Sequence, residues 1–285
     1  MKEHFFKDKK LVNIILNCRE RIDLTRKLIH SIETKTKNLH LINLTILIDF
    51  DDQELINFFT KYGNETNIDF KLIVRQRTHE LCKGGINLCY KISDPAYFYW
   101  VLNNDTHIIT DNWDEILYNR TKNVLKEFNG DQKFVYVHID DDTHVPHHHL
   151  VKGNSFPICS TTIGEVFNGC VPEEILHWTY DTRVYGIISW VKRHPDIGSN
   201  VSILDLIEDI KIQHTTYYIK TKTGQTSINT DKKREDKRVK DDIDERVRHF
   251  TNDLGLFAES GYTEKKYYDR FMKNMNRCNH CGKIL

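Results

Sequence analysis

The sequence has few of the residues that break or bias a protein chain. It contains only 5 prolines and 13 glycines in 285 residues, and its 41 basic and 41 acidic residues leave no formal net charge. So few prolines and glycines exclude a low-complexity chain and favour an ordinary globular protein. The neutral balance excludes attraction of the whole molecule to nucleic acid or anionic membrane, so a polyanion would need a local basic patch. The length suits one large α/β domain, or one domain with appendages.

Signals for secretion or membrane insertion are also lacking. The N-terminal stretch MKEHFFKDKK is charged and has no apolar core, and no apolar run approaches the roughly 20 residues that span a bilayer. The 7 cysteines are odd in number and mostly lie far apart, which suits a reduced compartment better than a disulfide framework. We therefore expect a cytoplasmic protein. Abundant Ile, Asn and Lys indicate an AT-rich genome, as in many phages and viruses, in which case the location is the host cytoplasm.

The first part of the chain alternates apolar runs with helical patterns. Four runs rich in branched or aromatic residues predict buried strands: 11–18, 44–49, 70–74 and 97–102. Asp23 is expected to cap the first intervening helix, and Asp51 with Glu54 forms a capping-box pattern for the second. Gly84 and Gly85 precede the third helix. This alternation predicts right-handed βαβ units and a mostly parallel sheet flanked by helices.

The second part is less regular, and its end is highly charged. Helices are predicted at 113–128 and 181–193, strands at 134–139 and 207–213, and Pro172 can occupy the first turn of another helix. From 220 onward the chain reads as an exposed helix or linker, followed by an amphipathic segment and a Cys-x-x-Cys tail. We therefore predict two parts, an α/β domain at 1–219 and a charged helical C-terminal extension at 220–285.

Polar side chains follow three of the predicted strands. Because ligands of parallel sheets bind at the carboxyl ends of the strands, these residues are expected to line one cleft. Asp105 is the candidate metal ligand, since Mg²⁺ and Mn²⁺ prefer oxygen and commonly take one or two carboxylates plus substrate phosphates. The polar residues are Asn17, Arg19 and Arg21 after the first strand, Asp49, Asp51 and Asp52 after the second, and Asn103, Asn104 and Asp105 after the fourth.

The segment YFYWVLNNDTHIITDNWDEIL resembles the metal-binding strand of GT-A glycosyltransferases, particularly the inverting family 2. That family places Asp-x-Asp or Asn-Asp-Asp after the strand, and only the last acid is kept at 103–105. The resemblance covers residues 1 to about 215 and implies a Rossmann-like GT-A fold, a nucleotide-sugar donor and Mn²⁺ or Mg²⁺. It implies donor contacts from Asn17, Arg19, Arg21, Asn104, Asp49 or Asp51, and the helix-start residues Lys83, Gly85 and Asn87.

A narrower resemblance is to GT-A-like proteins of phage and mobile-element genomes. It rests on Phe-Pro-Ile-Cys-Ser at 156–160, Gly-Cys-Val-Pro at 169–172, Trp-Thr-Tyr-Asp at 178–181 and a strand ending in His214, in the same order and spacing. The resemblance implies that Asp181 is the general base and that His214 contacts the metal or the diphosphate. The implied reaction is a direct displacement, in which Asp181 takes the proton of the acceptor hydroxyl.

Several of these residues also have plain structural interpretations. Asp51 serves equally well as a helix cap, and Asp181 lies at a helix start, where a capping aspartate is common. Glu165, Glu173 and Glu174 are rivals for the role of base. The site residues after the first two strands therefore remain hypotheses at the level of sequence.

Other clusters compete with the leading site. Asp105 could be a turn residue, and His214 a surface histidine. The Asp- and His-rich stretch 138–149 contains a rival acidic motif but is typical of a solvated loop. Cys-Asn-His-Cys at 278–281 is half of a zinc knuckle, and the basic run 232–240 is interrupted by acids as a solvated helix face would be.

The leading function is a soluble glycosyltransferase whose acceptor, a glycan or a modified DNA base, the sequence does not identify, and two further interpretations stand beside it. A GT-A-fold binding protein without turnover is favoured by Asn103, which stands where the family has its first acid. A transferase that glycosylates modified bases of phage DNA would need a basic acceptor groove and would show steep salt dependence of DNA binding.

Overall fold

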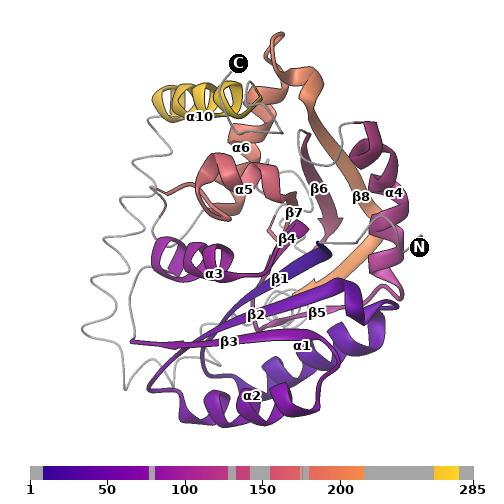
Figure 1. Ribbon diagram of the computed structural model, residues 1–285, viewed down its shortest axis with the longest axis vertical. Helices are drawn as coiled ribbons and strands as arrows, with labels where there is room; N and C mark the ends of the chain where they lie inside the picture. The colour runs from indigo at the N-terminus through magenta and orange to yellow at the C-terminus, as the bar shows by residue number, and fades with distance from the viewer. Residues whose placement is uncertain are drawn as a thin grey trace, which may run out of the picture.

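The computed structural model describes residues 9–76, 81–127, 133–141, 155–173, 175, 180–214 and 260–275. These residues form an α/β fold with one curled 8-stranded sheet of order β3-β2-β1-β4-β7-β6-β8-β5 (Figure 1). The pairs β1–β2, β1–β4, β2–β3 and β6–β8 are parallel. The strands are β1 Lys10–Cys18, β2 Ile42–Asp49, β3 Asp69–Arg75, β4 Ala96–Leu102, β5 Thr106–Ile108, β6 Phe134–Asp140, β7 Ile158–Ser160 and β8 Val201–His214.

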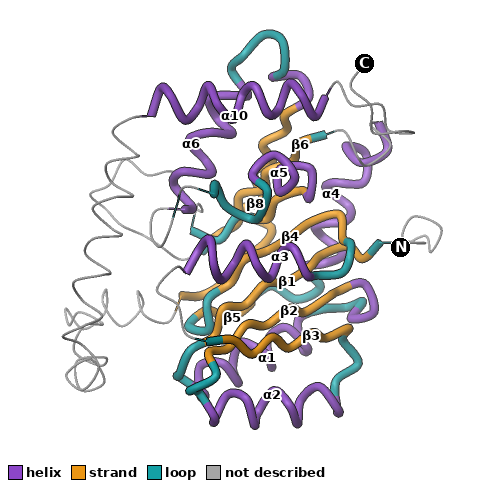
Figure 2. The backbone as a smooth tube through the Cα atoms, turned by 60° about the vertical axis from the view of Figure 1, so that its left-hand side comes forward, coloured by secondary structure: helices purple, strands orange, loops and turns teal. Residues whose placement is uncertain are grey.

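Helices cover both faces of the sheet (Figures 1 and 2). One core packs α1, α2 and α4 against the sheet, and a second core packs α3, α5, α6 and α10 against the other face. The helices are α1 Ile22–Lys35, α2 Gln53–Glu65, α3 Asn87–Ile92, α4 Trp113–Glu127, α5 Thr161–Phe167, α6 Tyr180–Lys192 and α10 Ser260–Met275, with short turns η2 Leu39–Leu41, η3 Leu81–Ile86 and η4 Gly198–Asn200.

The alternation of side chains along β4 explains why both of its faces are apolar. Phe98, Trp100 and Leu102 enter the first core, whereas Tyr99 and Val101 enter the second. Successive side chains of a strand point to opposite faces, so a strand covered on both sides must be apolar throughout. This is the pattern from which the buried strands were predicted, and the four strands of the first part are confirmed.

Two local predictions, both of helix caps, were wrong. Arg21, not Asp23, is the N-cap of α1, because residues 20 and 21 adopt left-handed backbone angles and the helix begins one residue before Asp23. Asp52, not Asp51, caps α2, since its carboxylate accepts from the N–H of Leu55 at 3.3 Å. The glycine pair at 84–85 does precede the third helix as predicted, because it lies in the π-helical turn η3 and α3 begins directly after that turn, at Asn87.

The second part of the chain holds one helix that the sequence reasoning missed and one that it placed in the extension. Helix α5 was missed, and the predicted amphipathic segment is α10, whose Tyr267 and Phe271 are buried against Phe167 of α5. The predicted charged stretch 220–259 and the Cys-x-x-Cys tail lie outside the described residues, as does part of the segment after Pro172. Among the described residues, no helix has the length and apolarity that a membrane crossing requires.

Candidate functional site

Two predicted metal ligands meet at the carboxyl edge of the sheet. After β4 the chain turns at 103–106, where the N–H of Thr106 bonds to the carbonyl of Asn103 at 3.1 Å. The short strand β5 then pairs antiparallel with β8, with Thr106 opposite His214. This register places His214 Nε2 at 3.2 Å from Asp105 Oδ1. The fold thus joins residues that are far apart in the chain.

Arg21, which lies between β1 and α1, completes this cluster. Its Nη1 donates to Asp105 Oδ2 at 2.8 Å, a charge-assisted hydrogen bond. The two oxygens of the Asp105 carboxylate therefore face two different groups, an imidazole on one side and a guanidinium on the other. We call Asp105, His214 and Arg21 the strand-end cluster.

The loop between β1 and α1 is held in an unusual backbone conformation. Glu20 and Arg21 have φ angles of 52° and 56°, in the left-handed region that residues other than glycine rarely adopt. The side-chain amide of Asn104 holds this loop, because its nitrogen donates to the carbonyl of Glu20 at 3.0 Å, to that of Arg19 at 3.2 Å and to Thr25 Oγ1 at 3.3 Å. Such conformations persist where surrounding contacts fix them, often at functional sites.

A second charged group lies at the end of β2. Asp49 is buried, with Arg19 Nη1 3.6 Å from one carboxylate oxygen and Arg75 Nε 3.7 Å from the other. Arg75 also donates to the carbonyl of Gly84. This arrangement brings Asp49 beside the β1–α1 loop, as the sequence predicted for strand ends that share one edge.

The helical turn η3 approaches β1 closely at a glycine. A Cβ on Gly85 would lie 3.0 Å from Asn17 Nδ2 and 3.4 Å from Arg75 Nη2. The contact with Asn17 is tighter than ordinary packing, so glycine at 85 lets η3 lie close to the end of β1. Asn17 and Gly85 therefore sit together at this edge, next to the charged groups of Asp49 and Arg75.

Asn87 has a different place from the other predicted donor contacts. Its amide is buried and pairs with the backbone of Val171, donating to the carbonyl at 3.1 Å and accepting from the N–H at 3.0 Å. Gly169 lies against it, because a Cβ at that position would meet Asn87 Oδ1 at 2.3 Å. Asn87 thus fastens the 169–171 segment to α3, a role that no local sequence pattern indicated.

For three predicted site residues, Asp51, Lys83 and Asp181, the structure gives only the place of the backbone or the exposure of the side chain. Asp51 is exposed in the turn before α2. Lys83 belongs to η3 and Asp181 to the first turn of α6, and their side chains lie outside what the structure describes. Of the rival acidic stretch, Asp140 and its neighbour Asp141 are buried at the end of β6, and 142–149 lie outside the described residues.

The strand-end cluster offers a divalent cation two protein ligands. The 3.2 Å between Asp105 Oδ1 and His214 Nε2 fits neighbouring positions on an octahedral ion, whose ligands at about 2.1 Å lie about 3.0 Å apart. In the part of the chain that the structure describes, no group of three His, Cys, Asp or Glu side chains is arranged around a common ion position. The donor set therefore fits Mn²⁺ or Mg²⁺ that is also held by substrate phosphates and water.

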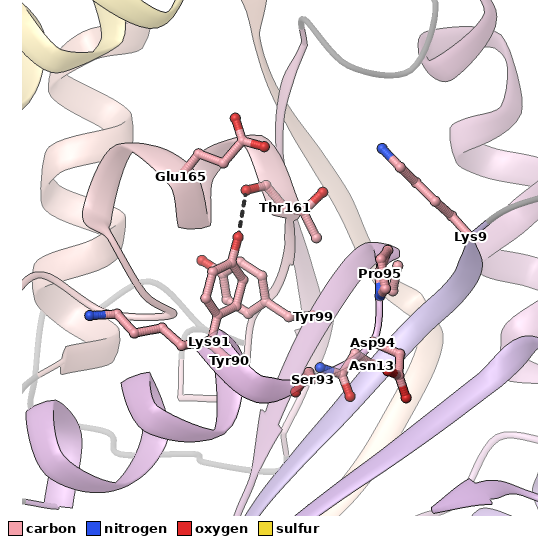
Figure 3. A pocket seen from close by; sticks show the side chains of 11 residues that line it. Lys9, Asn13, Tyr90, Lys91, Ser93, Asp94, Pro95, Tyr99, Thr161 and Glu165 are labelled. Carbon is pink, nitrogen blue, oxygen red and sulfur yellow. Dashed lines mark hydrogen bonds between the residues drawn. The ribbon is translucent and has the colours of Figure 1, made fainter. Parts of the chain in front are cut away.

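A hollow of about 230 Å³ lies at the opposite edge of the sheet (Figure 3). It is lined by residues at the starts of β1 and β4, including Lys9 and Ala96. Figure 3 shows the Tyr90 hydroxyl reaching the Thr161 carbonyl, a bond of 3.0 Å that ties α3 to α5. Ligands of parallel sheets bind at the carboxyl edge, which is the edge of the strand-end cluster and not the edge of this hollow.

Comparison with known proteins shows the fold. No family model matches the sequence, and no curated protein matches it. The first 349 residues of TarS from S. aureus superpose with a TM-score of 0.52 at 11% identity, over 93% of this chain and 90% of that one. A mannosyltransferase from Pyrobaculum calidifontis gives 0.51 at 10% identity, over 73% and 57%. GalNAc-T7 gives 0.50 at 11%, over 73% and 44%.

These neighbours share the GT-A glycosyltransferase fold, which is therefore the fold of this chain. Structures of TarS hold UDP or UDP-GlcNAc. The mannosyltransferase structure holds GDP-Man and Mn²⁺, and that of GalNAc-T7 holds UDP, GalNAc and Mn²⁺. The likeness in fold confirms the fold class expected from the sequence.

Proposed function

We propose that this protein is a nucleotide-sugar-dependent glycosyltransferase. The observation that carries the proposal is the strand-end cluster, in which Asp105 meets His214 and Arg21 at the carboxyl edge of a GT-A fold. Structural neighbours that hold UDP-GlcNAc or GDP-Man support the same class of donor for this chain.

In this proposal Asp105 and His214 hold Mn²⁺ or Mg²⁺, which offsets the charge that develops on the departing nucleoside diphosphate. Arg21 and Arg19 lie before the N-terminus of α1, where unpaired N–H groups and the helix dipole favour an anion. The phosphates of the donor would therefore contact this loop. Asp49 would accept hydrogen bonds from the ribose or the base.

Most of the remaining predicted donor contacts have a positioning role in this proposal, because they hold the loops and walls around the nucleotide. Asn17 and Gly85 shape the wall beside the nucleotide, and Asn104 fixes the loop that carries the arginines. Asn87 fastens the 169–171 segment. Lys83 and Asp51 remain candidates for contact with the phosphates and the ribose.

Asp181 is the proposed general base. It lies in the first turn of α6, so it belongs to a part of the chain separate from the donor-binding loops. An aspartate that takes the proton of the acceptor hydroxyl allows that oxygen to attack the anomeric carbon directly, with loss of the diphosphate. The proposed reaction therefore inverts the configuration of the sugar.

Residues 1–219 would carry this chemistry, with 220–285 as an extension.

The acceptor is proposed to be a glycan hydroxyl, with a hydroxyl on a modified base of phage DNA as the alternative. The four free cysteines of the described residues, all buried, support a cytoplasmic location, because reduced thiols are the rule there. Binding to duplex DNA that weakens steeply with salt would favour the second acceptor and the phage origin. DNA binding that shows no such dependence on salt would favour a glycan as the acceptor.

A binding protein without turnover is the second candidate. Asn103 occupies the place of the first acid of the metal motif, and the described residues contain no group of three His, Cys, Asp or Glu side chains that could hold an ion without help from a ligand. Titration calorimetry with UDP-, GDP- and CMP-sugars, with and without Mn²⁺, separates the two candidates. An enzyme shows metal-dependent affinity and slow hydrolysis of the bound donor. Affinity without any hydrolysis supports the binding protein, and no affinity for any donor contradicts both.

A further inference from the structure

Arg21 is the most exposed member of the strand-end cluster. Its side chain is 27% exposed, whereas those of Asp105 and His214 are 10% and 11% exposed. Of the two groups that contact the Asp105 carboxylate, Arg21 is therefore the more accessible to solvent, and His214 is the more buried. A group that leaves Asp105 toward solvent meets less resistance than one packed beneath it. Arg21 is the member that can move.

We infer that Arg21 is a shuttling cation, which neutralises Asp105 in the donor-free protein and transfers to the diphosphate when a nucleotide sugar binds. This inference rests on the proposed function. Arg21 and a metal ion then compete for the negative charge of the Asp105 carboxylate, because Arg21 contacts Oδ2 at 2.8 Å and the ion would bind Oδ1 beside His214. The role of Arg21 is to make the metal and the donor bind as a pair.

The position of Arg21 in the chain suits both of its partners. It is the N-cap of α1, so its backbone lies at the end of the helix where an anion is favoured. The planar guanidinium binds carboxylates and phosphates with the same geometry, so it can exchange one for the other without losing its hydrogen bonds. The left-handed loop beneath it is fixed by Asn104, so the exchange needs movement of the side chain only.

Competition for one carboxylate has a measurable consequence. Nucleoside diphosphate draws Arg21 away from Asp105 and so raises the affinity for the metal, and the metal raises the affinity for the diphosphate by the same factor. Couplings of this kind typically amount to about 5–150-fold. Removing Arg21 should therefore change the two affinities in opposite directions, whereas a purely structural loss would weaken both.

The test is a titration of the donor-free full-length protein with Mn²⁺, followed by electron paramagnetic resonance of the free ion. Arg21→Ala is compared with Arg21→Asn, because asparagine tolerates left-handed backbone angles and so protects the fold. Arg26→Ala is the matched control. Arg26 lies on the same helix, 58% exposed and 3.7 Å from Asp23, so this variant removes the same charge without touching Asp105.

Both Arg21 variants are expected to bind Mn²⁺ about 5–150-fold more tightly than the parent without nucleotide, and to bind UDP or GDP more weakly in the presence of a chelator. Arg26→Ala should resemble the parent in both measurements. Mn²⁺ affinity that stays unchanged or falls in both Arg21 variants overturns the inference. If the parent itself binds Mn²⁺ but neither UDP nor GDP, the proposed function fails instead, so the two failures are distinguishable.

Discussion

The side-chain amide nitrogen of Asn104 lies 3.0 Å from the carbonyl oxygen of Glu20 and donates a hydrogen bond to it. The same nitrogen reaches the carbonyl of Arg19, so one side chain after β4 holds the loop after β1. Asparagine is needed here as a donor, because backbone carbonyls only accept. The amide at position 104 is therefore explained by the loop that it holds.

Asn104→Asp should weaken Mn²⁺ binding, although it adds an acid beside Asp105. A carboxylate at 104 faces two carbonyl oxygens and cannot donate, which costs about 1–3 kcal/mol and releases the loop that carries Arg21. Asn103→Asp is the matched control, since it adds the same charge one residue earlier and leaves the Asn104 bonds in place. Titration with Mn²⁺ should rank Asn103→Asp above Asn104→Asp, and the reverse order would refute this role.

The sequence predicted β1, β2, β4 and β6 well because each is a continuous apolar run that is largely buried, whereas β5 and β7 were missed because each has only 3 residues. It could not derive the contact between Asp105 and His214 from local pattern, because that contact depends on the pairing of β5 with β8. His214 was found through family resemblance alone. Strands β5 and β8 belong to different parts of the chain, so only the folded sheet reveals the register in which they pair.

The position of a helix cap could be predicted from the sequence only to within about one residue. Asp51 and Asp52 are equally good caps by type, and the choice of Asp52 follows from the path of the chain after β2. The left-handed angles at Glu20 and Arg21 depend on Asn104, which lies more than eighty residues away in the chain. Helix α5 was missed because it has only 7 residues, too few for a clear period.

Asp114→Ala should destabilise the fold strongly. The Asp114 carboxylate is fully buried and accepts from the N–H of Lys37 at 2.8 Å, and from the N–H and side-chain amide of Asn38 at 3.0 and 2.8 Å. Loss of these bonds leaves buried donors unpaired and should lower the free energy of unfolding by about 2–4 kcal/mol. Urea unfolding measures the change.

The matched control for Asp114 is Asp111→Ala. Asp111 is 73% exposed and pairs with Lys35 at 2.7 Å, and an exposed ion pair contributes at most about 1 kcal/mol. Equal unfolding free energies for the two variants would show that the buried carboxylate does not hold the end of α1.

The docking of α10 should weaken in acid. A hydrogen bond from Lys266 lowers the pKa of Glu173, a bond from Arg270 lowers it further, and burial opposes both. Because the folded pKa lies below the unfolded one, the stabilisation is present above the unfolded pKa and is lost as the pH falls through the folded pKa. Glu173 is more than a third exposed, so the effect stays below about 1 kcal/mol.

Thermal unfolding of Glu173→Gln tests this linkage. The variant should melt below the parent at about pH 7, and the difference should disappear once the pH has fallen below the lowered pKa of Glu173, where both side chains are neutral. Glu65→Gln is the control, because Glu65 and Lys61 form an exposed pair at 3.9 Å on α2. A difference for Glu173→Gln that persists unchanged at the lower pH would exclude the ionic contribution.

Asp181→Asn should reduce turnover about 10²–10⁴-fold and leave the affinity for the donor unchanged, since a general base acts in the chemical step. Rates of sugar transfer or donor hydrolysis, together with donor titration, separate the two quantities. Glu165→Gln is the control, because Glu165 lines the hollow at the opposite edge of the sheet and should not affect the rate. If Glu165→Gln loses activity and Asp181→Asn does not, the base has been assigned wrongly.

The central claim is that Asp105 binds the cation that holds the diphosphate of a sugar donor. Calorimetric titration of UDP and GDP, with Mn²⁺ and with chelator, tests it in the parent, in Asp105→Ala and in Asp140→Ala, whose acid lies at the end of β6. We predict metal-dependent binding in the parent and in Asp140→Ala, and none in Asp105→Ala. Metal-dependent binding that survives in Asp105→Ala would contradict the account.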